Sequence, residues 1–243
     1  MSAPDHALKA VRERMVHACE QAGRDPDTVQ LLAVSKTRAA DDIRALHTLG
    51  QTAFGENYVQ ELVDKFDALE TGPEPLGLEW HYIGALQSNK TRPVAERAHW
   101  VHTIDRERIA RRLSEQRPAD LPPLQVCLQI NVSDESQKAG VPPEAAAALA
   151  DTVANLPGLT LRGLMTLPAA ESDRECQRQP FARLRQLQDE LNARGHSLDT
   201  LSMGMSGDLE AAILEGATVI RIGTALFGPR AAPASNPSTQ ESA

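Results

Sequence analysis

Short apolar runs alternate with amphipathic stretches along most of this chain. The runs predict strands, and apolar residues that recur every three or four positions predict the helices between them. The expected strands cover residues 29–35, 53–55, 80–83, 100–104, 124–132, 160–165, 200–203 and 219–222. The expected helices cover residues 3–22, 40–49, 58–69, 88–97, 106–116, 143–155, 173–193 and 208–215.

This alternation predicts parallel strands, because parallel neighbours need a crossover connection. Eight strands within 243 residues favour an α/β fold with a single domain, a (β/α)8 TIM barrel over residues 1–230 that begins with an N-terminal helix. A doubly wound open sheet is the alternative, although the first strand is not followed by the Gly-x-Gly-x-x-Gly of its dinucleotide-binding version. Residues 231–243 are small and polar, which predicts a disordered tail.

Charge and cysteine content narrow the classes of function. The net charge of −8 argues against nucleic-acid binding, and the arginines within 106–117 are interspersed with glutamates, as on a solvated helix face. Cys19, Cys127 and Cys176 are far apart and predict neither a disulfide framework nor a zinc site. No N-terminal hydrophobic segment has the length of a signal or a membrane span, so we expect a cytoplasmic protein with no membrane partner.

Lys36 is the most informative residue, because it follows the first predicted strand directly. In a barrel, the residues at the carboxyl ends of the strands meet at one face, where ligands bind. An amine at this position either pairs with an anion or condenses with a carbonyl as a Schiff base. The same face should receive Asn57, which follows the second strand, and His81 from the third.

The ends of the seventh and eighth strands carry the groups of a phosphate site. Ser206 and Thr224 supply hydroxyls, and Gly223 allows the backbone to approach an anion closely. Barrels often bind phosphate after these two strands. The alternative is that Ser206 only caps the following helix and that Gly223 only forms a tight turn. Together with Lys36, these residues favour a phosphorylated aldehyde, and pyridoxal 5′-phosphate (PLP) carries both groups on one ring.

Arg221 lies in the eighth strand, two residues before Gly223, within reach of the pyridine nitrogen of such a ring. A guanidinium cannot accept a proton, so the nitrogen would stay neutral and the ring would be a weak electron sink. Such a site holds the cofactor better than it drives carbanion chemistry. A salt bridge at the barrel rim is the alternative interpretation of Arg221.

Several motifs resemble those of a known family. They are Leu32-Ala-Val-Ser-Lys36, Phe54-Gly-Glu-Asn-Tyr-Val-Gln-Glu61, His81-Tyr-Ile-Gly-Ala-Leu-Gln-Ser-Asn-Lys90, Met203-Gly-Met-Ser206 and Val219-Ile-Arg-Ile-Gly-Thr-Ala-Leu-Phe-Gly228. Through them the chain resembles the YggS/PROSC family of PLP-binding proteins, the pyridoxal phosphate homeostasis proteins, from about residue 6 to 229.

The resemblance implies a fold similar to the N-terminal domain of alanine racemase, which is PLP fold type III. It leaves His81 either as a wall of the site or as a hydrogen-bonded core histidine, and it makes Lys138 a candidate second aldehyde site. The residues implied to hold the cofactor are Lys36 as the Schiff-base lysine, Arg221 at the pyridine nitrogen, Asn57 beside the ring or Lys36, and Ser206, Gly223 and Thr224 at the phosphate.

The role that the resemblance implies is control of the intracellular PLP (vitamin B6) pool by a non-catalytic carrier or buffer, with apo PLP-dependent enzymes as candidate recipients. The competing hypothesis is a PLP-dependent amino-acid racemase, which needs a proton-transfer group on each face of the cofactor. In the resembled racemase that second group is a tyrosine brought by a separate C-terminal domain of a partner subunit.

Neither tyrosine of this chain is an obvious second base, since Tyr58 begins a helix and Tyr82 lies inside a strand. We therefore expect a monomer without robust catalytic turnover. Weak racemase-like activity remains an alternative. A third hypothesis is a barrel that binds another phosphorylated metabolite, with Lys36 as a simple counter-ion.

Overall fold

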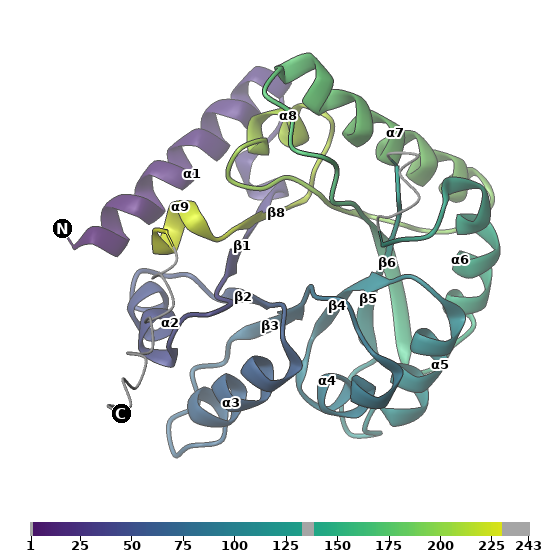
Figure 1. The fold of residues 1–243 in the computed structure, drawn as a ribbon, viewed down its shortest axis with the longest axis horizontal. Coiled ribbons are helices and arrows are strands. Elements are labelled where there is room, and N and C mark those ends of the chain that lie inside the picture. Colours follow the sequence, from purple (N-terminus) through teal and green to yellow (C-terminus); the bar gives the residue numbers. More distant parts are fainter. Residues whose placement is uncertain (1, 133–138, 230–243) are drawn as a thin grey trace, which may run out of the picture.

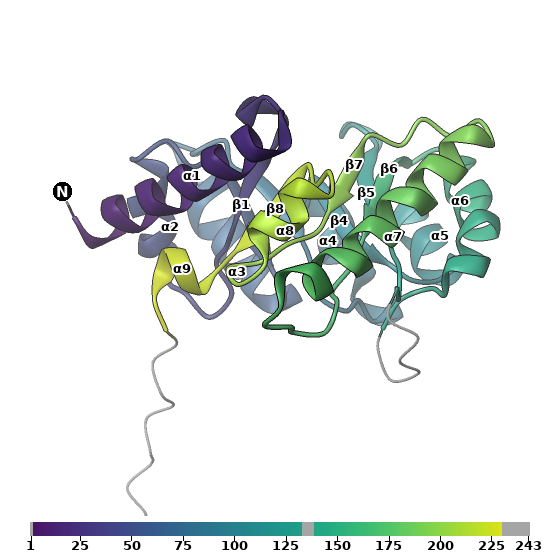
Figure 2. The ribbon, with the colours of Figure 1, turned by 90° about the horizontal axis from the view of Figure 1, so that it is seen from above.

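Eight parallel strands close into a barrel (Figures 1 and 2). The computed structural model describes residues 2–132 and 139–229. Each strand pairs with the next along the chain, and β8 pairs back with β1. This closure confirms the predicted (β/α)8 barrel, because an open sheet would keep two unpaired edges. The strands are β1 (Gln30–Val34), β2 (Ala53–Glu56), β3 (Glu79–Tyr82), β4 (Trp100–Ile104), β5 (Leu124–Gln129), β6 (Leu159–Met165), β7 (Thr200–Ser202) and β8 (Val219–Ile222).

The α-helices surround the strands on the outside (Figure 1). α1 precedes the barrel and packs against α8 and α9, so the first and last helices of the described chain are neighbours. No helix among the described residues is both long and apolar enough to cross a membrane. The helices are α1 (Ala3–Ala22), α2 (Ala40–His47), α3 (Val59–Glu70), α4 (Thr91–Arg97), α5 (Glu107–Gln116), α6 (Ala146–Ala154), α7 (Arg174–Ala193), α8 (Leu209–Leu214) and α9 (Thr224–Phe227), with 3-10 turns at Pro26–Thr28, Ser88–Lys90 and Pro143–Ala145.

Some helices and strands begin or end at other residues than the sequence pattern predicts. The helix expected over 88–97 divides into a 3-10 turn and α4, because Pro93 has no N–H to donate to the carbonyl of Asn89. The strand expected over 124–132 ends at Gln129, and Ile130 lies outside it in an isolated bridge with Val141. The short helix α9 was not predicted, since four residues carry too little of the helical period.

The interior of the barrel is apolar in one part and polar in another. Leu32, Val34, Ala53, Ile83 and Val219 form an apolar cluster separate from the main core between strands and helices. His102 on β4 and Ser202 on β7 are not neighbours in the sheet, yet His102 Nδ1 and Ser202 Oγ lie 2.7 Å apart. Both side chains therefore point into the barrel, and they form part of a polar layer beneath the site.

Candidate functional site

A cavity of about 420 Å³ opens at the carboxyl ends of the strands. Residues from β1, β8 and the segments that follow β1, β2, β3, β6, β7 and β8 line it. This is the face at which a barrel assembles ligand sites. The lining residues are Val34, Lys36, Arg38, Asn57, Ile83, Leu167, Met205, Ser206, Gly207, Arg221, Gly223 and Thr224.

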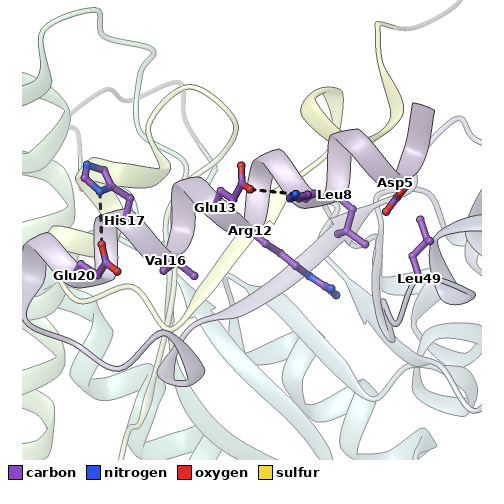
Figure 3. A pocket seen from close by; sticks show the side chains of 9 residues that line it. Asp5, Leu8, Arg12, Glu13, Val16, His17, Glu20 and Leu49 are labelled. Carbon is purple, nitrogen blue, oxygen red and sulfur yellow. Dashed lines mark ion pairs between the residues drawn. The ribbon is translucent and has the colours of Figure 1, made fainter. Parts of the chain in front are cut away.

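A second hollow runs along α1 beside Leu49, and charged side chains of one helix make up most of its lining (Figure 3). It includes two exposed ion pairs within the helix, Lys9–Glu13 at 3.9 Å and His17–Glu20 at 3.8 Å. It receives no residue from the carboxyl end of a strand. We therefore locate the candidate site in the cavity that contains Lys36.

The structure gathers six of the seven predicted site residues in this cavity, namely Lys36, Asn57, Ser206, Arg221, Gly223 and Thr224. His81 does not line it. Its side chain is buried in the barrel, stacks on Trp100 with ring centroids 5.6 Å apart, and places Nδ1 2.9 Å from Nε2 of His102. Its position is that of a hydrogen-bonded core histidine. Lys138 and the tail 231–243 lie outside the described residues.

Arg221 is buried in the barrel interior and hydrogen-bonds to neutral groups. It donates to Ser202 Oγ at 2.9 Å and to the carbonyl of Thr166 at 2.9 Å. Burial lowers its pKa to about 10, so the guanidinium stays charged at neutral pH. These two bonds fix the plane of the guanidinium. Arg221 is therefore a buried residue bonded to neutral groups, and it does not form the salt bridge at the barrel rim that was the alternative interpretation.

The same hydrogen-bonded layer continues from Arg221 to the histidines. Ser202 Oγ accepts from Arg221 and lies 2.7 Å from Nδ1 of His102, whose Nε2 faces Nδ1 of His81. Burial lowers the pKa of both histidines, and for His102 it does so strongly. The two imidazoles are therefore neutral at pH 7, and Arg221 contributes the positive charge of this layer.

Ser206 belongs to the cavity rather than to a helix cap. The helix that follows it, α8, begins at Leu209 with Asp208 at the N-cap position. From α1, Arg14 donates to the carbonyl of Ser206 at 3.1 Å and forms an ion pair with Glu210 at 2.7 Å. The alternative interpretation, in which Ser206 only caps the helix, does not hold, and the Ser206–Gly207 segment is held from behind by α1.

The charged side chains of the lining are all positive. It contains three cationic side chains, Lys36, Arg38 and Arg221, and no carboxylate among its described residues. Sequence reasoning missed Arg38, although its place two residues after Lys36 on the same loop was a usable signal. Arg38 donates to the carbonyl of Gly228 at 2.6 Å and so ties this loop to the end of α9. Such a cavity suits an anion.

Asn57 is held tightly and offers an acceptor that the described chain leaves unpaired. A Cβ on Gly84 would lie 1.9 Å from the carbonyl oxygen of Asn57, so only glycine permits this approach. The hydroxyl of Tyr82 donates to the same carbonyl at 3.2 Å. The side-chain oxygen Oδ1 is buried without a partner among the described residues. A ligand or lysine donor in the cavity would satisfy it.

Neither tyrosine lines the cavity. Tyr82 is a core residue, and burial raises its pKa to about 12. Tyr58 precedes α3, and 55% of its surface is exposed. Within the described residues, Lys36 is the single side chain of the lining whose type commonly serves as a general acid or base.

Comparisons with known proteins show the family to which this chain belongs. The model of the alanine racemase N-terminal domain matches residues 7–231, so the chain belongs to that family of barrels. Within it, the chain groups with the pyridoxal phosphate homeostasis proteins. It is 56% identical to the one from Pseudomonas aeruginosa over 97% of this chain and 100% of that protein. It is 52% identical to the one from Escherichia coli K12, over 93% and 96% of the two chains.

Solved structures agree with this placement. PipY of Synechococcus elongatus, solved with PLP bound, is 36% identical, with a TM-score of 0.76 over 90% of this chain and 100% of PipY. The alanine racemase of Corynebacterium glutamicum is 17% identical, with a TM-score of 0.61 over 90% of this chain and 60% of the racemase. The second likeness concerns the fold alone.

Proposed function

We propose that this chain binds PLP as a Schiff base on Lys36 and takes part in PLP homeostasis as a non-catalytic carrier or buffer. The observation that carries the proposal is the convergence of an amine, a buried guanidinium and the Ser206, Gly223 and Thr224 segments in one cavity. The PLP-bound relative PipY supports the choice of ligand. The proposed place of action is the cytoplasm, where the thiols of the three free cysteines stay reduced.

The residues of the cavity match the groups of PLP. When bound, PLP supplies an aldehyde that condenses with an amine with loss of water, and a ring that withdraws electrons. Lys36 supplies the amine, and Ser206 and Thr224 supply hydroxyl donors for the phosphate beside Gly223, which has no side chain to keep an anion from its backbone. Asn57 Oδ1 offers a buried acceptor to the ring substituents or to Lys36.

Arg221 is the proposed partner of the pyridine nitrogen. As a permanent donor it binds a neutral nitrogen and does not protonate it. Its bonds to Ser202 and Thr166 hold it in place from behind. This pairing weakens the electron sink of the ring, which favours storage of the cofactor over carbanion chemistry.

A carrier fits the proton-transfer groups of the site better than a racemase does. Racemisation requires groups on both faces of the cofactor, and the described lining provides only Lys36. We propose a monomer that loads and releases PLP, with apo PLP-dependent enzymes as recipients.

The test is an absorbance titration with PLP of the wild type and of Lys36→Ala, followed by an amino-acid racemisation assay on the same samples. We expect a Schiff-base band at roughly 410–430 nm in the wild type, its loss in the variant, and no racemisation above background. Turnover that depends on Lys36 would establish a racemase instead. A wild type that binds PLP without the band would reduce Lys36 to a counter-ion for a phosphorylated ligand.

A further inference from the structure

A buried lysine, Lys65, binds the backbone before Lys36 directly and the backbone after Lys36 through Glu61. Lys65, on α3, donates from Nζ to the carbonyl of Ser35 at 2.7 Å. It also donates to Glu56 Oε1 and to Glu61 Oε2, each at 2.8 Å. An ammonium has three donors, so all of them are used. One contact therefore falls on the residue directly before Lys36.

Glu61 carries the connection to the residue directly after Lys36. Its Oε2, which pairs with Lys65, also accepts from the backbone N–H of Thr37 at 2.7 Å. Thr37 has a φ of 62° and is the one non-glycine residue in the described ranges with a positive φ. A β-branched residue adopts this conformation only when its surroundings impose it. The bond to Glu61 is one constraint, and a turn bond from the N–H of Arg38 to the carbonyl of Ser35 at 3.0 Å is another.

This arrangement is buried and has its own charge balance. Lys65 is 6% exposed and Glu56 is fully buried. Ser35 Oγ donates to Glu56 Oε1 at 2.6 Å, which fixes the strand end from a second direction. Lys65 does not line the cavity. Its ammonium is thus committed to two carboxyl groups and a carbonyl, which leaves it unsuited to be a second amine for an aldehyde.

From these contacts we infer that Lys65 is a positioning residue for Lys36. It holds the carbonyl before Lys36 directly and the N–H after it through Glu61, so the backbone on both sides of Lys36 has one orientation. That orientation directs the Lys36 side chain into the cavity. Without Lys65, Thr37 relaxes toward negative φ, and the Lys36 amine turns away from the phosphate site. This role of Lys65 rests on the proposed function, in which Lys65 has no part so far.

The first test compares Lys65→Met with the wild type and with Lys9→Met. Methionine keeps the length of lysine and removes the donors. Lys9 is the matched control, because it is an exposed lysine with an i,i+4 glutamate partner at 3.9 Å. PLP affinity is measured from the Schiff-base band on the folded fraction, which circular dichroism quantifies. We expect Lys65→Met to weaken PLP binding about tenfold or more and Lys9→Met to leave it unchanged.

A second readout needs no cofactor. Hydrogen exchange of the Thr37 amide, followed by NMR in protein without PLP, reports the bond to Glu61. We expect exchange to be about tenfold faster or more in Lys65→Met, because Glu61 loses the charge that holds it. A structural role at the interface between α3 and the strands would lower stability without changing this amide selectively.

Glu61 variants keep the inference testable if Lys65→Met does not fold. The Glu61 side chain is 28% exposed, so its replacement is milder. Glu61→Leu removes the acceptor of the Thr37 N–H, whereas Glu61→Gln keeps an oxygen there. We expect weaker PLP binding in Glu61→Leu and substantial recovery in Glu61→Gln.

The outcomes separate this inference from the proposed function. Folded Lys65→Met or Glu61→Leu protein with wild-type PLP affinity would overturn the positioning role, even if the Thr37 amide exchanged faster. A wild type without the Schiff-base band would overturn the proposed function instead. In that case unchanged exchange of the Thr37 amide in Lys65→Met would also refute the geometry inferred for Lys65.

Discussion

Glu56→Gln tests whether burial or the Lys65 ammonium controls the ionisation of the carboxyl at the end of β2. Glu56 is fully buried, and burial raises its pKa to about 7 although Lys65 lies 2.8 Å away and lowers it. Oε2 has no hydrogen-bond partner among the described residues, so it is the oxygen on which a proton would reside. Glutamine reproduces this protonated state at every pH.

The folded protein keeps the Glu56 proton in a pH range where the unfolded chain has released it. Stability from this group is fully present below about pH 4.5 and is lost as the pH rises to about 7. Each unit of pKa difference corresponds to about 1.4 kcal/mol. A rise from 4.5 to about 7 therefore predicts that the wild type loses about 3 kcal/mol relative to Glu56→Gln across this window.

The assay is urea denaturation of both proteins between about pH 4.5 and 7.5, with the free energy of unfolding compared at each pH. The comparison is needed because burial lowers the pKa of His81 and His102. Their contribution has the opposite sign, since it is present above their unfolded pKa and is lost as the pH falls. It cancels in the difference between the variants. A difference that stays constant, or that favours the wild type as the pH rises, would show that the ionised pair with Lys65 prevails.

Two further predictions concern the walls of the cavity. Gly84→Ala should destabilise the fold by about 1–3 kcal/mol in urea denaturation and weaken PLP binding, because its Cβ would meet the carbonyl of Asn57 at 1.9 Å. Gly72→Ala, where a Cβ meets nothing within 4 Å, is the neutral control, and equal effects of the two would contradict the crowding. Thr224→Val keeps the shape and removes the hydroxyl, so it should weaken PLP about tenfold in the same titration while pyridoxal, which lacks the phosphate, binds unchanged. An equal loss for both ligands would place the phosphate elsewhere.

Much of the fold followed from local pattern. The alternation of apolar runs and amphipathic stretches indicated the barrel, because strand and helix periods are properties of neighbouring residues. The ends were less accessible. Residue 130 looked like a continuation of β5, yet among the described residues its bridge partner is Val141, which lies outside the named strands. Such endings depend on the partner strand rather than on the residue.

The site divides in the same way. The sequence predicted that Lys36, Ser206 and Thr224 lie at one face, and they line the cavity there, since the strand ends of a barrel meet at that face whatever the detailed packing. His81 was ambiguous because the direction of its side chain depends on which residues the neighbouring strand β4 presents. The structure supplies His102 and Trp100 as its neighbours, from a strand that the sequence of β3 does not reveal.

What the sequence determined by itself is the order of elements and the residue types that stand at their ends. Only the tertiary structure decided which charged side chains are buried and which backbone and side-chain groups they contact. Glu61 and Lys65 read as an ordinary i,i+4 pair on a helix surface, worth a few tenths of a kcal/mol when exposed. Packing of α3 beside the ends of β1 and β2 brings Ser35 and Glu56 to the same ammonium. Burial removes water as the competing partner, and this converts a surface pair into the element that orients Lys36.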